Sequence, residues 1–121
     1  MKKIAINGFG RIGRLAFREM ITSKDLDVVA INDLATAEEL AYLLKYDTNH
    51  RSFHEEQIGF ENDCLVIAGV KRIKVYSEKD PINLPWKKLQ IDAVLECSGH
   101  FNKYEDAYKH IEYGAKKVVI S

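Results

Sequence analysis

Cysteine is scarce in this sequence, since Cys64 and Cys97 are the only two among 121 residues. Two thiols far apart in sequence match neither a disulfide framework nor a CxxC metal site. The histidines add no second pair of ligands, because even His50 and His54 lie in a polar stretch without a helical pattern. We therefore expect no bound metal.

Net charge and long apolar runs are also absent. Eighteen basic residues balance eighteen acidic ones, so no long-range field recruits nucleic acid or an anionic membrane. No apolar run approaches the roughly 20 residues that a membrane span requires. The segment after Met1 begins directly with a strand pattern instead of a signal peptide. We expect a soluble, cytoplasmic protein without a nucleic-acid or membrane partner.

The residues that are present suffice for one hydrophobic core, since 46% of the chain is apolar. Predicted strands and helices alternate, which indicates a doubly wound, mostly parallel sheet with helices on both faces. Short strands near the middle of the chain indicate a small antiparallel hairpin insertion. The expected strands are Lys2–Asn7, Leu26–Asn32, Gln57–Glu61, Cys64–Ala68, Arg72–Ser77, Asp92–Cys97 and Lys117–Ser121. The expected helices are Arg11–Ile21, one that follows Thr36 and includes Leu44, and Lys103–Tyr113.

Two of these helices carry clear local signals. Thr36 and Glu39 match a capping box, in which each side chain accepts a hydrogen bond from the other residue's backbone amide. The apolar residues of Arg11–Ile21 fall on one stripe that should pack on the sheet, with Arg14 and Arg18 on the solvated stripe. The apolar stripe consists of Ile12, Leu15, Ala16, Phe17 and Met20.

The sequence Gly8-Phe9-Gly10-Arg11-Ile12-Gly13 is a GxGxxG motif directly after a predicted strand and at the start of a predicted helix. Gly8 permits a tight turn, Gly10 lets the backbone approach a pyrophosphate, and Gly13 lets the helix pack closely on the strand. The free amides near Arg11 and Ile12 then point at the phosphates, where a helix N-terminus stabilises an anion by roughly 0.3 to 2 kcal/mol.

Asp33 strengthens this interpretation, because it follows the second predicted strand 20 residues after Gly13. A carboxylate there can accept two hydrogen bonds from the adenosine ribose, and it disfavours NADP, whose extra phosphate would face it. The alternative is a plain glycine-rich turn followed by an unrelated carboxylate. An S-adenosylmethionine enzyme also has an acidic residue after its second strand, but the complete GxGxxG fits a dinucleotide better.

Several segments resemble the glyceraldehyde-3-phosphate dehydrogenase family, in order and along essentially the whole chain. They are INGFGRIGR (6–14), VAINDL (29–34), LLKYD (43–47), IKVYSEKDPINLPW (73–86), ECSG (96–99) and GAKKVVIS (114–121). The resemblance implies a Rossmann-type NAD-binding domain over residues 1–121. It also implies a homo-oligomer, which in the full-length family is a tetramer.

The family resemblance also implies which residues contact NAD. The pyrophosphate lies at the start of the first helix, the ribose at Asp33, and the adenine near Lys79, where many members have arginine. Ser98 and Gly99 match a loop beside the cofactor, and Ser121 stands where the family has a hydroxyl residue near the nicotinamide. The full set of expected cofactor-binding residues is Gly8, Gly10, Arg11, Ile12, Gly13, Asp33, Lys79, Ser98, Gly99 and Ser121.

The family's chemistry depends on residues that this sequence does not contain. Its catalytic cysteine lies in a Ser-x-x-Cys-Thr-Thr-Asn segment downstream of GAKKVVIS, and the paired histidine lies further on. Cys97 ends a predicted strand without matching neighbours, and we interpret it as an ordinary buried thiol. We expect no catalytic residue and no catalytic domain in this chain, which should bind NAD but be inactive alone.

For the full-length enzyme the resemblance implies phosphorylating oxidation of glyceraldehyde 3-phosphate in glycolysis, with that sugar phosphate as substrate. Two alternatives stay open. Erythrose-4-phosphate dehydrogenases have similar opening motifs, although they tend to have glutamate at the position of Asp33. The chain could also be a non-catalytic nucleotide-binding module.

Overall fold

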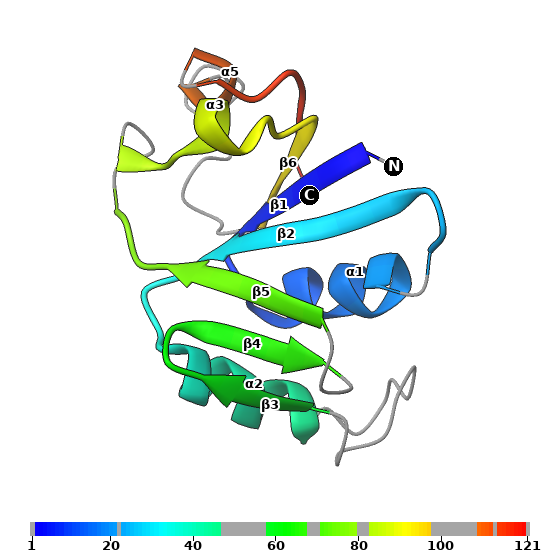
Figure 1. Ribbon diagram of the computed structural model, residues 1–121, viewed down its shortest axis with the longest axis vertical. Coiled ribbons are helices and arrows are strands. Elements are labelled where there is room, and N and C mark those ends of the chain that lie inside the picture. The colour runs from blue at the N-terminus through cyan, green and yellow to red at the C-terminus, as the bar shows by residue number, and fades with distance from the viewer. Residues whose placement is uncertain are drawn as a thin grey trace.

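The computed structural model describes residues 2–21, 23–46, 58–67, 71–79, 83–97, 109–112 and 114–120. Within these residues, seven strands form one sheet in the order β3-β4-β5-β2-β1-β6-β7 (Figure 1). The strands are β1 (Lys2–Asn7), β2 (Leu26–Asn32), β3 (Ile58–Glu61), β4 (Cys64–Ile67), β5 (Lys71–Tyr76), β6 (Ala93–Glu96) and β7 (Val118–Ile120). The helices are α1 (Arg11–Ile21), α2 (Ala37–Lys45), α3 (Trp86–Leu89) and α5 (Lys109–Glu112).

Five adjacent strands, β5-β2-β1-β6-β7, run parallel, while β3, β4 and β5 pair antiparallel at one side. This confirms the predicted doubly wound, mostly parallel sheet with a small antiparallel part. The chain passes from β1 to β2 and β5 on one side and returns to β6 on the other side of β1. Such a reversal leaves a crevice beyond the carboxyl ends of the strands. We call the ends of β5, β2, β1 and β6 the carboxyl edge.

The predicted elements are present with small shifts at their ends. The Thr36 and Glu39 capping box is confirmed, because each residue's backbone N–H donates to the other's side chain at 3.1 Å. Strands β3 and β4 are joined by a two-residue turn that begins at Asn62, whose φ is 55°. The predicted antiparallel pairing of β4 and β5 is confirmed, although the residues that join them lie outside the described part. Of the helix expected at Lys103–Tyr113, the structure describes α5.

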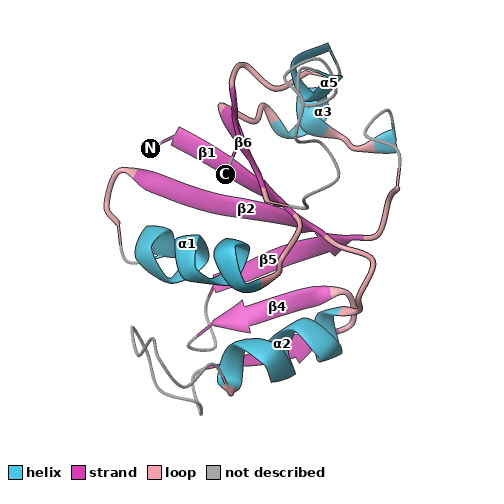
Figure 2. Ribbon diagram, turned by 180° about the vertical axis from the view of Figure 1, so that it is seen from behind, coloured by secondary structure: helices cyan, strands magenta, loops and turns pink. Residues whose placement is uncertain are grey.

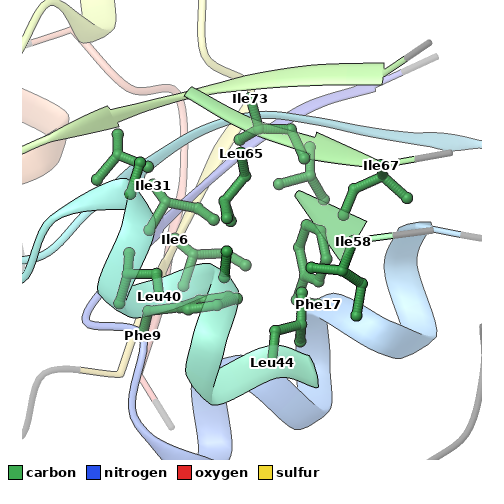
Figure 3. Close-up of a cluster of buried hydrophobic side chains, with 14 of the residues drawn as sticks. Ile6, Phe9, Phe17, Ile31, Leu40, Leu44, Ile58, Leu65, Ile67 and Ile73 are labelled. Carbon is green, nitrogen blue, oxygen red and sulfur yellow. The ribbon is translucent and has the colours of Figure 1, made fainter. Parts of the chain in front are cut away.

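A large apolar core lies between one face of the sheet and the helices α1 and α2 (Figures 2 and 3). Ile6 of β1 and Ile31 of β2 meet Phe17 of α1 and Leu44 of α2, and all four are 0% exposed. Strand Cβ atoms alternate between faces, which accounts for the apolar residues on both sides of these central strands.

A second, smaller cluster lies on the opposite face. Its centre is Trp86, which is fully buried, and the small side chains of Ala5 and Ala30 leave room for the indole. The buried members of the cluster are Ala5, Ala30, Leu84, Trp86, Ile91, Val94 and Ala115. Both faces of the parallel strands are therefore covered, as buried parallel sheets require.

The expected orientation of α1 is wrong at two positions. Ile12 is 54% exposed and Arg18 is only 3% exposed, although Ile12 was expected in the core and Arg18 in solvent. The guanidinium of Arg18 donates to the Leu44 carbonyl oxygen in the last turn of α2. Because α1 contacts α2 as well as the sheet, its buried face extends beyond the apolar stripe.

Candidate dinucleotide site

The turn after β1 has the geometry that its glycines predict. Gly8 has a φ of 94°, a region that side chains rarely adopt, and its N–H donates to the Asn32 carbonyl oxygen at 2.8 Å. A Cβ on Gly13 would lie 2.3 Å from the Gly8 carbonyl oxygen, so α1 packs against the turn only because Gly13 has no side chain. A Cβ on Gly10 would meet nothing within 4 Å. The space beside Gly10 is open for a ligand to approach the backbone.

Helix α1 presents its amino terminus to this open space. The Arg14 N–H donates to the Gly10 carbonyl oxygen at 2.8 Å and forms the first turn. The amides of Arg11, Ile12 and Gly13 come before this bond and have no acceptor within the helix. The Arg14 guanidinium donates to the Phe9 carbonyl oxygen at 3.1 Å, and this hydrogen bond also stabilises the turn. Free amides at the positive end of an 11-residue helix form a favourable binding site for an anion.

Asp33 lies directly beside the glycine turn. Its Oδ2 accepts from the Phe9 N–H at 2.7 Å, and its Oδ1 accepts from the Ala35 N–H at 2.9 Å. Each carboxylate oxygen has a second lone pair, so both can still accept a hydrogen bond from a ribose hydroxyl. The contact with Phe9, which the sequence did not indicate, holds the carboxylate against the glycine turn.

Four more residues are expected to contact the cofactor, namely Lys79, Ser98, Gly99 and Ser121, and the structure describes only the first of them. Lys79 is exposed and follows β5, whose Tyr76 carbonyl oxygen accepts from the Asp33 N–H at 2.9 Å. Ser98, Gly99 and Ser121 lie outside the described residues. None of these assignments as cofactor contacts is tested by the fold itself, and they remain predictions.

Both cysteines are partly exposed. Cys97 follows β6 and is partly exposed, so the prediction of a buried thiol is wrong. Its N–H donates to the Asn7 carbonyl oxygen at 2.8 Å, so the pairing of β6 with β1 continues one residue beyond Glu96. For Cys64, burial and then the neighbouring Asp63 carboxylate raise the pKa of the thiol, which disfavours the reactive thiolate.

A buried polar network at the carboxyl edge was not predicted. The Asn32 Nδ2 donates to the Asn7 Oδ1 at 2.7 Å, and the Asn7 Nδ2 donates to the Glu96 Oε2 at 2.7 Å. The same Glu96 oxygen lies 2.7 Å from the His110 Nε2, and the Trp86 Nε1 donates to the His110 Nδ1 at 2.9 Å. One feature of the sequence could have indicated this network. A polar residue, Asn7, Asn32 or Glu96, ends each of three apolar strands and stands directly before a motif.

A hollow of about 460 Å³ lies at the opposite, amino-terminal edge of the sheet. Its lining residues are Lys3, Lys87, Gln90, Asp92, Gly114 and Lys116. Asp92 is already engaged, since it accepts from the Lys3 N–H at 2.8 Å and lies 3.3 Å from the Lys116 ammonium. Three of its lining residues are lysines, and among the lining residues the only carboxylate, Asp92, is held by Lys3 and Lys116, so the hollow has no acceptor like that of Asp33 beside the glycine turn.

Within the described part of the chain, no three His, Cys, Asp or Glu side chains are grouped so that they could hold a metal ion. None of the helices described there is long and apolar enough to cross a membrane.

A glycine turn, a helix N-terminus and a carboxylate on the next strand meet where the strand order reverses, and together they define a Rossmann-type dinucleotide-binding domain. Residues 2–104 match the family described as "Glyceraldehyde 3-phosphate dehydrogenase, NAD binding domain". The chain belongs to this family, whose cofactor is NAD.

Curated relatives agree with this assignment. A glyceraldehyde-3-phosphate dehydrogenase of Clostridium pasteurianum is 54% identical over 121 residues, which are 100% of this chain and 36% of the relative. The enzyme of Geobacillus stearothermophilus is 50% identical over 119 residues, or 98% of this chain and 35% of the relative. The cytosolic enzyme of Trypanosoma brucei brucei is 47% identical over 119 residues, with the same coverage. The chain thus spans about 36% of the length of its relatives.

Proposed function

We propose that this chain binds NAD at the carboxyl edge and acts as the cofactor domain of a phosphorylating glyceraldehyde-3-phosphate dehydrogenase. The observation that carries the proposal is the contact between Asp33 and the Phe9 amide, which fixes a carboxylate beside the free amides of α1. A diphosphate and its adjoining ribose have this spacing of anion and hydroxyl groups.

Each group at the edge has a distinct part in the proposed binding. The amides of Arg11 and Ile12 hold the pyrophosphate, while the open space beside Gly10 admits it to the backbone. The Asp33 carboxylate accepts from the adenosine ribose, and Lys79 lies on the adenine side. Bound NAD supplies a hydride acceptor, and this chain supplies only its binding and orientation.

Asp33 also accounts for a preference for NAD over NADP. A phosphate on the adenosine ribose would face the carboxylate at about 4 Å. Each unit of like charge at that distance costs about 1 kcal/mol in water and about 4 kcal/mol at an effective dielectric constant of 20. The proposed site is therefore selective for NAD.

Titration calorimetry with NAD and NADP tests this assignment on the wild type and on Asp33→Asn. Loss of a hydrogen bond to a charged group costs about 1.5 to 3 kcal/mol, so we expect NAD to bind at least about 10-fold more weakly. NADP should lose less affinity than NAD, because the repulsion is removed. Asp92→Asn at the amino-terminal edge is the matched control and should leave both affinities unchanged.

Two outcomes count against the ribose assignment. Undiminished NAD affinity in Asp33→Asn contradicts it directly. An equal loss for NAD and NADP shows that Asp33 only supports the glycine turn through the Phe9 amide.

For the longer protein we propose oxidation and phosphorylation of glyceraldehyde 3-phosphate in glycolysis, in the cytoplasm and as a homo-oligomer. The catalytic residues then lie outside this chain, which should bind NAD without activity. Assays of the full-length protein with glyceraldehyde 3-phosphate and erythrose 4-phosphate test the substrate. A higher kcat/KM for erythrose 4-phosphate overturns this part of the proposal.

A further inference from the structure

The segment that follows β5 is held to the end of β2 by a side chain instead of by backbone pairing. The last described backbone hydrogen bond between them runs from the Asp33 N–H to the Tyr76 carbonyl oxygen, at 2.9 Å. In a regular parallel ladder, the Glu78 N–H would next donate to the Asp33 carbonyl oxygen. It donates instead to the Asn32 Oδ1 at 2.9 Å, and the Glu78 carbonyl oxygen accepts from the Asn32 Nδ2 at 2.8 Å. Among the residues that the structure describes, no backbone hydrogen bond joins residues 77–79 to β2.

The amide of the Asn32 side chain has one favourable orientation. The Glu78 N–H can only donate and its carbonyl oxygen can only accept, so exchanging the amide oxygen and nitrogen of Asn32 would place like groups opposite each other. The Asn32 Nδ2 also donates to the Asn7 Oδ1 at 2.7 Å, so it has an acceptor for each of its two protons. Asn32 is only 5% exposed, which limits the access of water to these hydrogen bonds. Its side chain therefore fixes residues 77–79 relative to β2.

Residues 77–79 lie where the base of the proposed ligand is expected. Along the carboxyl edge, the glycine turn follows β1, Asp33 follows β2 and residues 77–79 follow β5, and these strands are neighbours in the order β5-β2-β1 (Figure 1). The adenosine part of a dinucleotide has pyrophosphate, ribose and base in that order. With the pyrophosphate at the start of α1 and the ribose at Asp33, the base extends toward the end of β5.

We propose that Asn32 is a positioning residue for the adenine side of the site. It makes no contact with the ligand and acts through the Glu78 peptide, which it holds together with the adjoining Lys79 beside the end of β2. This inference rests on the proposed function, in which Lys79 lies on the adenine side. Binding residues must be held in place by the groups behind them, and here one buried amide holds the segment.

The ribose contact does not depend on the same side chain. The Asp33 carboxylate accepts from the Phe9 and Ala35 amides, and the Asp33 N–H donates to the Tyr76 carbonyl oxygen. None of these hydrogen bonds involves the side chain of Asn32. Replacing that side chain should therefore loosen the adenine side, while the ribose and pyrophosphate sides stay in place.

Amide hydrogen exchange tests the positioning directly. It compares wild type with Asn32→Leu, because leucine is close to asparagine in shape but makes no hydrogen bond. We expect the Glu78 amide to exchange at least about 10-fold faster in the variant, since its acceptor is lost, while the Asp33 amide keeps its rate. Asn32→Ala replaces Asn32→Leu if the leucine variant does not fold. An unchanged rate at Glu78 overturns the inference.

A double-mutant cycle connects this change to binding. Calorimetry measures the NAD affinity of wild type, Asn32→Leu, Lys79→Ala and the double variant. In wild type, Lys79→Ala should weaken binding about 3-fold, as expected for the loss of a cation beside an aromatic base. In Asn32→Leu the same substitution should change the affinity by less than about 1.5-fold, because the lysine is no longer held in place. A merely structural role of Asn32 predicts that the two effects add.

Asn7→Leu is the matched control. It removes the hydrogen bond between Asn7 and Asn32 but leaves both hydrogen bonds to Glu78 in place. The Glu78 amide should exchange as in wild type, and Lys79→Ala should keep its effect of about 3-fold in this background. If the effect of Lys79→Ala were lost in Asn7→Leu as well, the contact between Asn32 and Glu78 would not be its cause, and the inference would be overturned.

The outcomes separate this inference from the proposed function. If wild type does not bind NAD, the proposed function is overturned, and the inference with it. If wild type binds NAD but Lys79→Ala has no effect, or the effects of the two substitutions add, the NAD site stands and the positioning role of Asn32 is overturned.

Discussion

The apolar core beneath α1 and α2 and the buried polar network at the carboxyl edge are both shielded from water, but they are held by different forces. The core is built from interchangeable apolar contacts without direction, and it supplies most of the stability. The network consists of hydrogen bonds with defined donors and acceptors between Asn7, Asn32, Glu96 and His110. The core therefore stabilises the domain as a whole, whereas the network joins particular atoms at the ends of β1, β2 and β6.

Removing a core side chain should have the largest effect on folding. Leu65→Ala deletes a 0% exposed side chain, and we expect the free energy of unfolding to fall by about 2 to 5 kcal/mol. Urea unfolding followed by Trp86 fluorescence measures the loss. The NAD affinity of the folded fraction should not change. If the NAD affinity of folded Leu65→Ala fell together with its free energy of unfolding, the core and the carboxyl edge would not have separate roles.

Substitutions at two glycines of the same turn should have different effects, one on the free energy of unfolding and the other on the affinity for NAD. Gly13→Ala forces a Cβ to 2.3 Å from the Gly8 carbonyl oxygen, and we expect a loss of about 1 to 3 kcal/mol in unfolding free energy. Gly10→Ala meets no atom within 4 Å, so stability should change by less than about 1 kcal/mol. The added methyl group instead occupies the space proposed for the pyrophosphate, and NAD should bind about 10-fold more weakly. Wild-type NAD affinity in Gly10→Ala would contradict this placement.

Much of the fold follows from local sequence signals. Apolar strands that alternate with amphipathic helices predicted the parallel sheet, and the Thr36 capping box predicted the start of α2. The motif spacing predicted that Gly8 and Asp33 would lie at one edge. Local backbone rules determine such features, so the sequence alone suffices.

Features that depend on tertiary contacts were not predictable in the same way. Arg18 is charged, so the sequence favours a position at the surface. Its guanidinium has a buried acceptor, the Leu44 carbonyl oxygen, only because the carboxyl end of α2 packs against α1. His110 and Asn7 are 103 positions apart and meet at Glu96 only after the sheet has formed. Hydrophobic periodicity relates only residues that are close in sequence, so it cannot identify contacts between residues this far apart.

The smallest expected effect concerns the partly exposed carboxylate of Asp92 at the amino-terminal edge. The Lys3 backbone N–H and then the Lys116 ammonium lower the pKa of Asp92 below its ordinary value of 3.8. Because the folded-state pKa is lowered, the stabilisation is fully present above the unfolded value and is lost as the pH falls through the folded value. Urea unfolding should show wild type slightly more stable than Asp92→Asn at pH 6, with the difference shrinking below about pH 4. A difference that grows toward low pH would contradict this sign.

The most direct test of the account is an NMR titration of the ¹⁵N-labelled chain with NAD, because the amides at the two edges of the sheet report separately. We predict the largest chemical-shift changes at Gly8 to Ile12 and at Asp33, at the carboxyl edge. Changes concentrated instead at Lys3, Gln90 and Lys116, around the hollow at the opposite edge, would contradict the central claim that the amino terminus of α1 and Asp33 bind the dinucleotide.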